Sequence, residues 1–250
     1  MAVIGIMSAM HEELAAVLAA MPDEQGVRVA GRDFWVGHWH GHDVVVVLSR
    51  IGKVAAATTA TVLLERFKVD TLVFTGAAGG LAADVQVGDV VVASALVQHD
   101  MDASPLFPKH EVPLYGRSRF ETDAALSQAL AAAASQVLSD PAQHLGAQAI
   151  ADFHLLSPRV HQGLIVSGDR FVSTTAESQA LQRSLPDALA VEMEGAAVAQ
   201  VCLDYGVPFA AVRTISDRAD DDAHTDFSRF IREVASRYSL AILSQWLLDR

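Results

Sequence analysis

Residues 190–199 read AVEMEGAAVA, an apolar strand end that passes directly into an alanine-rich helix. Glu192 and Glu194 stand at the junction, and an extended backbone would direct both acids to the same side of the chain. Buried carboxylates are costly unless each has a partner or a task. The same residues also fit an exposed strand end whose glutamates favour the first turn of a helix, so the stretch alone leaves both interpretations open.

The alternation of strand and helix extends over the whole chain. Short apolar runs predict strands at 3–7, 34–39, 44–48, 71–74, 163–166 and 208–215, and one more that follows a turn at 87–89 and ends near 97. Helices are predicted at 11–18, 54–67, 121–138, 174–185, from the junction to about 205, and from about 227 to 248. We therefore predict an α/β fold, one domain over residues 1–250, with a central twisted mixed β-sheet flanked by helices.

Local signals define some of the element ends. Ser8 is the expected N-cap of the first helix, and Gly206 is the expected C-cap of the helix that ends near residue 205. The polar segment 99–119 contains three prolines and is predicted to be a functional loop or lid. The segment 139–161 is predicted to be irregular.

Composition narrows the class of protein. The 250 residues are 51% hydrophobic and carry a formal net charge of −12, which argues against nucleic acid or an anionic membrane as the main partner. A single cysteine, Cys202, excludes a disulfide framework within the chain. The first residues read as a strand rather than a signal peptide, and no apolar run is long enough to span a bilayer, so we expect a cytoplasmic protein.

Familiar cofactor and metal signatures do not match. Gly76 and Gly79-Gly80 lack the spacing of a dinucleotide-binding loop, and the sequence before Gly52-Lys53 lacks the first glycine of a P-loop. The histidines do not fall at metal-binding spacing, and no serine lies in a nucleophile elbow. We therefore expect no cofactor and no metal.

Acids instead follow several predicted strands. Glu12 and Glu13 come after the first, Glu192 and Glu194 after a middle one, and Asp217 after the last. Because ligands of open α/β sheets bind where the carboxyl ends of strands converge, we expect these acids to share a site. They would suit acid–base chemistry on a neutral or cationic centre.

Several of these residues lie in motifs that together resemble a known family. The motifs lie in the expected order along nearly the whole chain and are specific only together: GIMSAM with two glutamates at 5–13, IGKVAA at 51–56, TGAAGGL at 75–81, VGD at 87–89, SGD at 167–169, VEMEG at 191–195 and RTISD at 213–217. They resemble the 5′-methylthioadenosine/S-adenosylhomocysteine nucleosidases of the nucleoside phosphorylase superfamily.

The resemblance implies a nucleoside phosphorylase-like fold and hydrolysis of the N-glycosidic bond of an adenine thionucleoside. It assigns Asp217 as the general acid on the purine and Glu194 as the ligand of the ribose hydroxyls. Glu13 would activate the attacking water, with Glu12 the weaker candidate by one position. Carboxylates near the sugar would stabilise a transition state that resembles an oxocarbenium ion.

The resemblance also implies a set of substrate contacts. Phe171 would stack on adenine while the Val172 backbone reads its edge, and the Met193 backbone would lie beside the sugar. The remaining candidates are Gly79 for close backbone approach, Ile51 and Phe227 for the alkylthio pocket, and Arg213. Simpler interpretations remain open: Phe171, Phe227 and Met193 as core residues, and Asp217 as a helix cap.

Three departures from the family pattern bear on substrate choice. Arg50 stands where glycine is common, Ala77 stands where serine is common, and the loop 99–116 is longer and rich in proline. In the family this loop reaches the neighbouring subunit's site, so we expect a homodimer. An alternative role for Arg50 is to hold an anion. The alternatives are a purine nucleoside phosphorylase, a nucleosidase for another purine nucleoside such as futalosine, and a non-catalytic nucleoside-binding protein.

Overall fold

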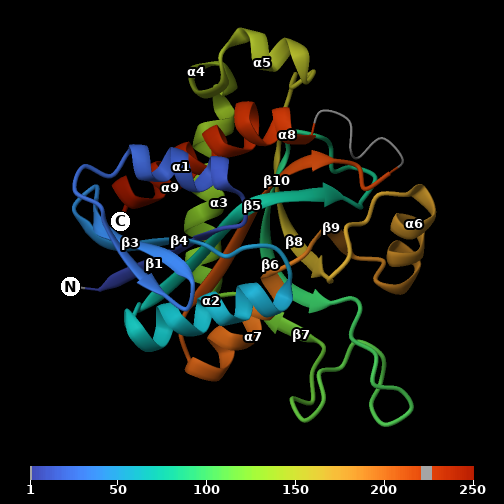
Figure 1. Ribbon diagram of the computed structural model, residues 1–250. Helices are drawn as coiled ribbons and strands as arrows, with labels where there is room; N and C mark the ends of the chain where they lie inside the picture. The colour runs from blue at the N-terminus through green and yellow to red at the C-terminus, as the bar shows by residue number, and fades with distance from the viewer. Residues whose placement is uncertain (1, 221–226) are drawn as a thin grey trace.

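The computed structural model describes residues 2–220 and 227–250, and its strands form one mixed sheet with helices around it (Figure 1). The strands are β1 (Val3–Ser8), β2 (Gln25–Val29), β3 (Arg32–Trp39), β4 (His42–Leu48), β5 (Thr71–Gly80), β6 (Val90–Gln98), β7 (Arg119–Glu121), β8 (Val160–Ser167), β9 (Ala188–Glu192) and β10 (Phe209–Asp217). The helices are α1 (His11–Ala19), α2 (Lys53–Arg66), α3 (Ala124–Ser139), α4 (Pro141–Leu145), α5 (Ala147–Asp152), α6 (Thr175–Ser184), α7 (Gly195–Tyr205), α8 (Phe227–Phe230) and α9 (Ser236–Leu248), with a π-helical segment, Ile231–Ala235, between the last two.

The sheet closes on itself in part. Its strand order is β10-β6-β8-β9-β5-β1-β4-β3-β2, and β10 also pairs with β5. Strands β5, β10, β6, β8 and β9 therefore form a ring, from which β1 to β4 extend as an open wing. β5 and β9 are antiparallel and meet near their carboxyl ends, where Gly79 pairs with Val191. This crossing brings the ends of β5, β9 and β10 together.

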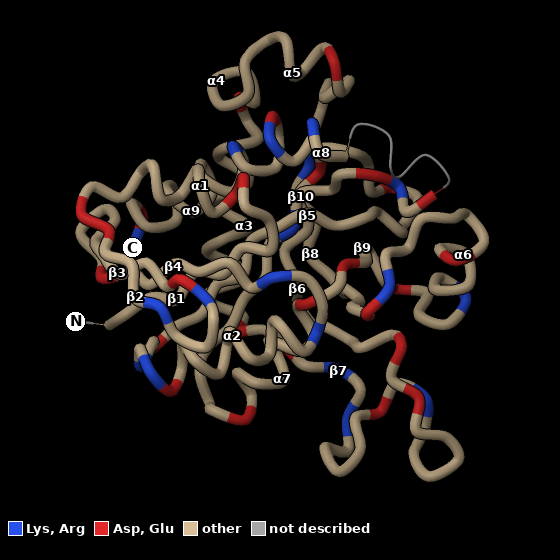
Figure 2. The backbone as a smooth tube through the Cα atoms, viewed as in Figure 1, with Lys and Arg blue, Asp and Glu red and all other residues tan. Residues whose placement is uncertain are grey.

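Helices cover the sheet in two layers. One apolar core lies against α1, α3 and α9 and includes Leu14, Leu130 and Ile242. A second lies against α2 and α7 and includes Leu63 and Val198. Most of the charged residues lie on loops and helices at the rim, while the strand centres are almost free of charge (Figure 2). Among the buried charged residues, Glu192 and Asp217 end β9 and β10, whereas Arg213 lies within β10.

The caps follow the local sequence, with one correction. Gly206 ends α7 in the left-handed conformation, φ 65°, which confirms the predicted C-cap. The N-cap of α1 is Met10 and not Ser8, so that prediction is wrong. The strand continues through Ser8, and the carboxylate of Glu13, three residues into the helix, accepts the Met10 backbone N–H and supplies the cap in place of a serine.

Several elements differ from the sequence-based prediction. The side chains of β2 are almost wholly exposed, so it has no apolar pattern, and β7 has three residues, which are too few to establish one. The segment 139–161 contains α4 and α5, each too short to show helical periodicity. β5 continues beyond the predicted end at 74 to Gly80, because its small residues still pair with β10 and β9.

Candidate active site

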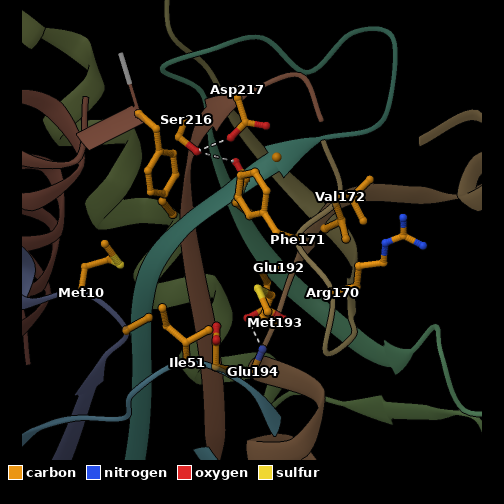
Figure 3. A pocket seen from close by; sticks show the side chains of 16 residues that line it. Met10, Ile51, Arg170, Phe171, Val172, Glu192, Met193, Glu194, Ser216 and Asp217 are labelled. Carbon is orange, nitrogen blue, oxygen red and sulfur yellow. Dashed lines mark hydrogen bonds between the residues drawn. The ribbon is translucent and has the colours of Figure 1, made fainter. Parts of the chain in front are cut away.

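A pocket opens where β1, β4, β5, β8, β9 and β10 end, and it has a volume of about 150 Å³ (Figure 3). Its lining contains eight of the ten predicted site residues, Ile51, Gly79, Phe171, Val172, Met193, Glu194, Asp217 and Phe227, together with Ala9, Met10, Ala77, Ala78, Arg170, Val191, Glu192 and Ser216. Glu13 and Arg213 are outside this lining. Acids from distant parts of the sequence therefore do reach one site, although not all of them face the cavity.

The two glutamates of the junction have different partners. Glu192 ends β9, and its carboxylate accepts hydrogen bonds from the Gly195 backbone N–H at 2.9 Å and from the Arg213 guanidinium at 2.8 Å. The Ser167 hydroxyl also donates to it. β9 ends at Glu192 and the backbone turns at Glu194 (φ −136°, ψ −42°), so the expected extended segment ends two residues before Glu194.

Glu194 is buried with little compensation. Its Oε1 accepts the Gly52 backbone N–H at 2.8 Å, which ties the loop after β4 to the start of α7. Burial and then the nearby Glu192 charge raise the pKa of Glu194, while the Gly52 hydrogen bond and Arg213 oppose that rise. A carboxylate in this state favours contact with hydroxyl groups or a developing positive charge.

Arg213 lies outside the pocket lining and holds Glu192, which is part of that lining. Its guanidinium is buried, lies 4.2 Å from the centre of the Phe74 ring, and donates to the backbone oxygens of Phe74 and Val212 as well as to Glu192. It was predicted as a substrate contact, but these bonds direct it to the protein interior. Its charge acts at a distance instead, because it lowers the pKa of both Glu13 and Glu194.

Asp217 lies at the last residue of β10. Its Oδ2 accepts the Ser216 hydroxyl at 2.7 Å and its Oδ1 accepts the Ala219 backbone N–H at 2.8 Å. A register shift between Ile215 and Asp217 occurs opposite Gly79. A Cβ on Gly79 would lie 2.9 Å from the Asp217 Oδ1, so only glycine leaves room for this carboxylate.

Glu13 is completely buried behind Met10, which lines the pocket. One carboxylate oxygen accepts the Met10 backbone N–H at 3.3 Å, and the other is 3.5 Å from the Ser239 hydroxyl of α9. Burial raises the pKa of Glu13 from 4.5 to about 7 despite the opposing effect of Arg213. It is thus a carboxyl that gains and loses a proton near neutral pH, held next to the cavity.

Apolar side chains complete the cavity. Phe171 is 39% exposed and contacts Phe227 edge to face, with 6.0 Å between the ring centres. Asp217 and Ser216 lie at one end of the pocket and Glu194 and Ile51 at the other (Figure 3). The exposed edge of Phe171 favours a ligand-stacking role over the simpler core interpretation.

Polar side chains clamp three loops of the pocket together, which the sequence alone does not predict. The Lys53 ammonium donates to Asp100 at 2.6 Å and to Gln98 at 3.2 Å. Asp100 accepts the Asp169 backbone N–H at 2.9 Å, and Asp169 accepts the Lys53 backbone N–H at 2.8 Å. Lys53 and Asp169 both belong to the quoted motifs, but only the fold shows that they face each other.

Residues 2–220 and 227–250 also bear on metal binding and membrane insertion. Over these ranges, no three His, Cys, Asp or Glu side chains are grouped so that they could hold a metal ion. Over the same ranges, none of the helices combines the length and the apolar character needed to cross a membrane.

Known proteins are similar to this chain over almost all of its length. The family model of the phosphorylase superfamily matches residues 3–245. The 5′-methylthioadenosine/S-adenosylhomocysteine nucleosidase of Shewanella baltica is 36% identical over 247 residues, which are 99% of this chain and 96% of that protein.

Solved structures agree. The nucleosidase of Neisseria meningitidis in complex with methylthio-immucillin-A superposes with a TM-score of 0.87 at 30% identity and covers 100% of both chains. The S-adenosylhomocysteine nucleosidase of Streptococcus pyogenes in complex with 5-methylthiotubericidin gives 0.84 at 34% identity, over 99% of this chain and 97% of that one. The predicted fold class is confirmed.

Fold and pocket together define an α/β protein of the phosphorylase superfamily. Within that superfamily, the chain belongs to the family of 5′-methylthioadenosine/S-adenosylhomocysteine nucleosidases. The resemblance inferred from the motifs is thereby confirmed.

Proposed function

We propose that this protein hydrolyses the N-glycosidic bond of 5′-methylthioadenosine and S-adenosylhomocysteine, giving adenine and the corresponding thioribose. The observation that carries the proposal is the buried acid pair Glu194 and Asp217 at opposite ends of one apolar pocket, with Glu13 next to it. The names and ligands of the relatives support the same substrate class.

The geometry suits departure of a purine from a sugar. Glu194 would bind the ribose hydroxyls, and its negative charge would stabilise the positive charge that develops on the sugar as the C–N bond breaks. Asp217, at the other end, would donate a proton to the purine so that adenine leaves as a neutral molecule. Phe171 would stack on the base, and the Val172 backbone would bind its edge.

Water is the second reactant. Its oxygen bonds to the anomeric carbon as the purine leaves, and the proton it loses passes to Glu13. A carboxyl whose pKa is about 7 can take up this proton and release it again near neutral pH. Glu13 lies next to the cavity, because its carboxylate accepts the backbone N–H of Met10, which lines the pocket.

The charges of the pocket favour water over phosphate. Among the described lining residues Arg170 is the only cation, and its side chain is 77% exposed and paired with Glu177. The Arg50 side chain, the candidate anion ligand, is directed away from this pocket and donates to the Gly31 carbonyl. A phosphorylase needs a cationic cradle for its phosphate, and this cavity presents acids instead.

The direct test is adenine release from 5′-methylthioadenosine in phosphate-free buffer. We expect full turnover without phosphate. Strict dependence on phosphate would instead make the protein a phosphorylase, and tight binding without any adenine release would make it a nucleoside-binding protein. A comparison with S-adenosylhomocysteine, adenosine and inosine completes the assignment of substrate class.

We further propose a cytoplasmic homodimer in which the loop 99–116 approaches the neighbouring site. The segment between β6 and β7 extends away from the body of the protein (Figure 1). Its Leu106 and Leu114 side chains are 83% and 92% exposed, which is costly unless another surface covers them. Light scattering tests the dimer, since a fully active monomer contradicts it, and cell fractionation tests the location.

A further inference from the structure

The segment between α3 and β8 contains two short helices for which the proposed function gives no role. α4 has five residues and α5 has six, and both project from the body of the protein close to α8 (Figure 1). Isolated helices of this length are not stable in water, so contacts with other elements must hold them. One such contact is the hydrogen bond from the Arg237 guanidinium of α9 to the Leu145 carbonyl, at 2.6 Å. We call residues 141–153, which include both helices and the C-cap Phe153, the arm.

The end of the arm is attached to α8 by an ion pair and by aromatic contacts. Asp152, the last residue of α5, pairs with Arg229 of α8. The next residue, Phe153, contacts the Phe230 ring edge to face, with 5.2 Å between the ring centres. The Arg229 guanidinium carbon also lies 4.9 Å from the centre of the Phe153 ring. Two adjacent residues of the arm thus contact two adjacent residues of α8.

These contacts are partly or wholly sheltered from solvent. The Arg229 side chain is 35% exposed and that of Asp152 is 29% exposed, while Phe230 is buried. Glu233 also pairs with Arg229, at 3.2 Å, so one guanidinium joins two carboxylates. An ion pair that is partly buried and stacked on an aromatic ring is stronger than an exposed pair. The arm therefore restrains α8.

α8 in turn carries part of the active-site pocket. It has four residues, about one helical turn, and begins at Phe227. Phe227 lines the pocket and contacts Phe171, the residue expected to stack on the base. Because residues three apart are neighbours on a helix surface, the position of Phe230 constrains the position of Phe227. The turn that the arm restrains is thus the turn that places an aromatic side chain in the pocket.

We infer that Asp152 and Phe153 are positioning residues for the active site, which hold α8 so that Phe227 packs against Phe171 in the conformation that binds substrate. The inference rests on the proposed function, in which Phe227 contributes to the alkylthio pocket. Neither arm residue is among the described residues of the pocket lining, so their effect on binding passes through α8. An arm that only completed the fold would change stability and leave substrate binding as it is.

The test begins with Asp152→Asn, which removes the charge and retains the size of the side chain. We expect KM for 5′-methylthioadenosine to rise about three- to fivefold, because a weaker restraint lowers the fraction of molecules in the binding conformation. kcat should change less than about twofold, since the substitution leaves the acids of the pocket in place. Asp140→Asn is the matched control, because Asp140 is exposed, precedes the arm and makes no side-chain cap bond to α4.

Three more variants show whether the effect passes through the contacts with α8. Phe153→Leu, which removes the ring and keeps an apolar side chain, should raise KM by a similar factor. Asp152→Glu keeps the charge and should stay close to wild type. Arg229→Gln should raise KM at least as much as Asp152→Asn. Adding Asp152→Asn to it should raise KM less than about twofold further, because both substitutions remove the same ion pair.

A purely structural arm gives a different pattern. If Asp152→Asn and Phe153→Leu lowered the melting temperature and left KM unchanged, the inference would be overturned. Equal rises in KM for Asp152→Asn and Asp140→Asn would also overturn it, since the loss of a negative charge in this region, and not the contact with α8, would then be responsible.

Failure of the proposed function would be seen in the wild type, which would then release no adenine from 5′-methylthioadenosine. Calorimetric affinity for the same nucleoside replaces KM in that case. Weaker binding by Asp152→Asn and Phe153→Leu, with wild-type affinity in Asp140→Asn, would still support the positioning role. Equal affinities in all of these proteins would overturn that role, as would a wild type that does not bind the nucleoside.

Discussion

Two groups of buried charges lie next to each other in this protein, and they are satisfied to different degrees. The first group, which we call the floor, is the pair of Glu192 and Arg213. Glu192 accepts hydrogen bonds from Arg213, from Ser167 and from backbone N–H groups. In the second, the acid wall of Glu13, Glu194 and Asp217, Glu194 has one strong backbone donor and Glu13 has two long contacts. Within the described ranges, neither Glu13 nor Glu194 has an ion-pair partner.

The number of hydrogen-bond and ion-pair partners distinguishes the buried acids with a structural role from those with a catalytic role. A buried carboxylate with a cation and several hydrogen-bond donors is fully partnered, and removal of the cation leaves a buried charge that nothing compensates. A buried carboxyl with few donors has a raised pKa and keeps some capacity to interact with a substrate. Glu192 and Glu194 are two residues apart, so sequence proximity alone says little about which role an acid takes.

The largest expected effect is that of Glu13→Gln in the acid wall. Because the amide cannot take a proton from water, kcat should fall by about 10²–10⁴-fold, the usual contribution of a general base. The free energy of unfolding should not fall, since the variant no longer buries a charge. Adenine release and urea unfolding measure the two effects. Glu12→Gln, one residue away and only half-buried, is the control, and equal losses in both variants would contradict the role of Glu13.

The floor should respond in the opposite way, through stability. Arg213→Met leaves Glu192 buried without its cation and should lower the free energy of unfolding by about 3–5 kcal/mol. Arg119→Met, which breaks an exposed pair with Asp187, should cost about 0–1 kcal/mol. Urea unfolding compares the two variants. If Arg213→Met proved no more harmful than Arg119→Met, the floor would not have the structural role assigned here.

The acid wall should also make both stability and activity depend on pH. The pKa of Glu13 rises from 4.5 to about 7 on folding, so its contribution to stability is full below about pH 4.5 and is lost as pH rises through about 7. The loss amounts to about 3 kcal/mol. Activity should change in the other direction across this window, because the base must be ionised. Stability and kcat/KM at several pH values test this, and Glu13→Gln should flatten the stability profile.

The sequence alone predicts the fold class well, because that prediction needs only periodicity. Alternating strands and helices are visible in the apolar runs, and the C-cap at Gly206 follows from the conformational freedom of glycine. The ring of strands is not predictable in this way. It depends on pairings between β10, β5 and β9 that are far apart in the sequence, and β5 makes them with glycines and alanines that carry no strand signal.

The site likewise contains some residues that the sequence predicts and others that only the fold brings into place. Residues directly after strands, such as Asp217 and Glu194, reach the pocket because strand ends converge there. Arg213 lies within β10, all of whose residues are buried, and its bonds to Phe74, Val212 and Glu192 are not evident from the motif that contains it. The clamp of Lys53, Asp100 and Asp169 joins three loops whose spacing only the fold determines.

A smaller effect on kcat/KM is expected from a substitution at Gly79, where the backbone of β5 contacts Asp217 of the acid wall. In Gly79→Ala, the new Cβ would lie 2.9 Å from the Asp217 Oδ1 and 3.0 Å from the Ala219 Cβ, so the carboxylate has to move. We expect kcat/KM to fall roughly ten- to a hundredfold, because small misplacements of catalytic groups are costly. Gly76→Ala on the same strand meets Arg213 at an ordinary 3.5 Å and should have little effect. Similar losses in both would point to β5 itself rather than Asp217.

The smallest effect concerns the clamp at the rim, which is connected to the acid wall through the Gly52 N–H on Glu194. Lys53→Met removes the ammonium but keeps the backbone bond to Asp169, so the loop after β4 should loosen without detaching. Because the Lys53 ammonium contacts Asp100 and Gln98 at the rim and none of the acids of the pocket, kcat/KM should fall only about threefold, mainly through KM.

Lys68→Met, which breaks an exposed pair with Glu65, is the control for the loss of a lysine charge and should leave kcat/KM unchanged. Lys53→Arg should recover most of the activity if the charge positions the loop. If Lys53→Met instead lowered kcat as strongly as Glu13→Gln, then Glu194 would depend on the rim for its orientation. In that case the rim, and not the floor, would position the acid wall. Glu192 would still have a purely structural role, but the residues around the pocket would no longer divide into a structural group and a catalytic group.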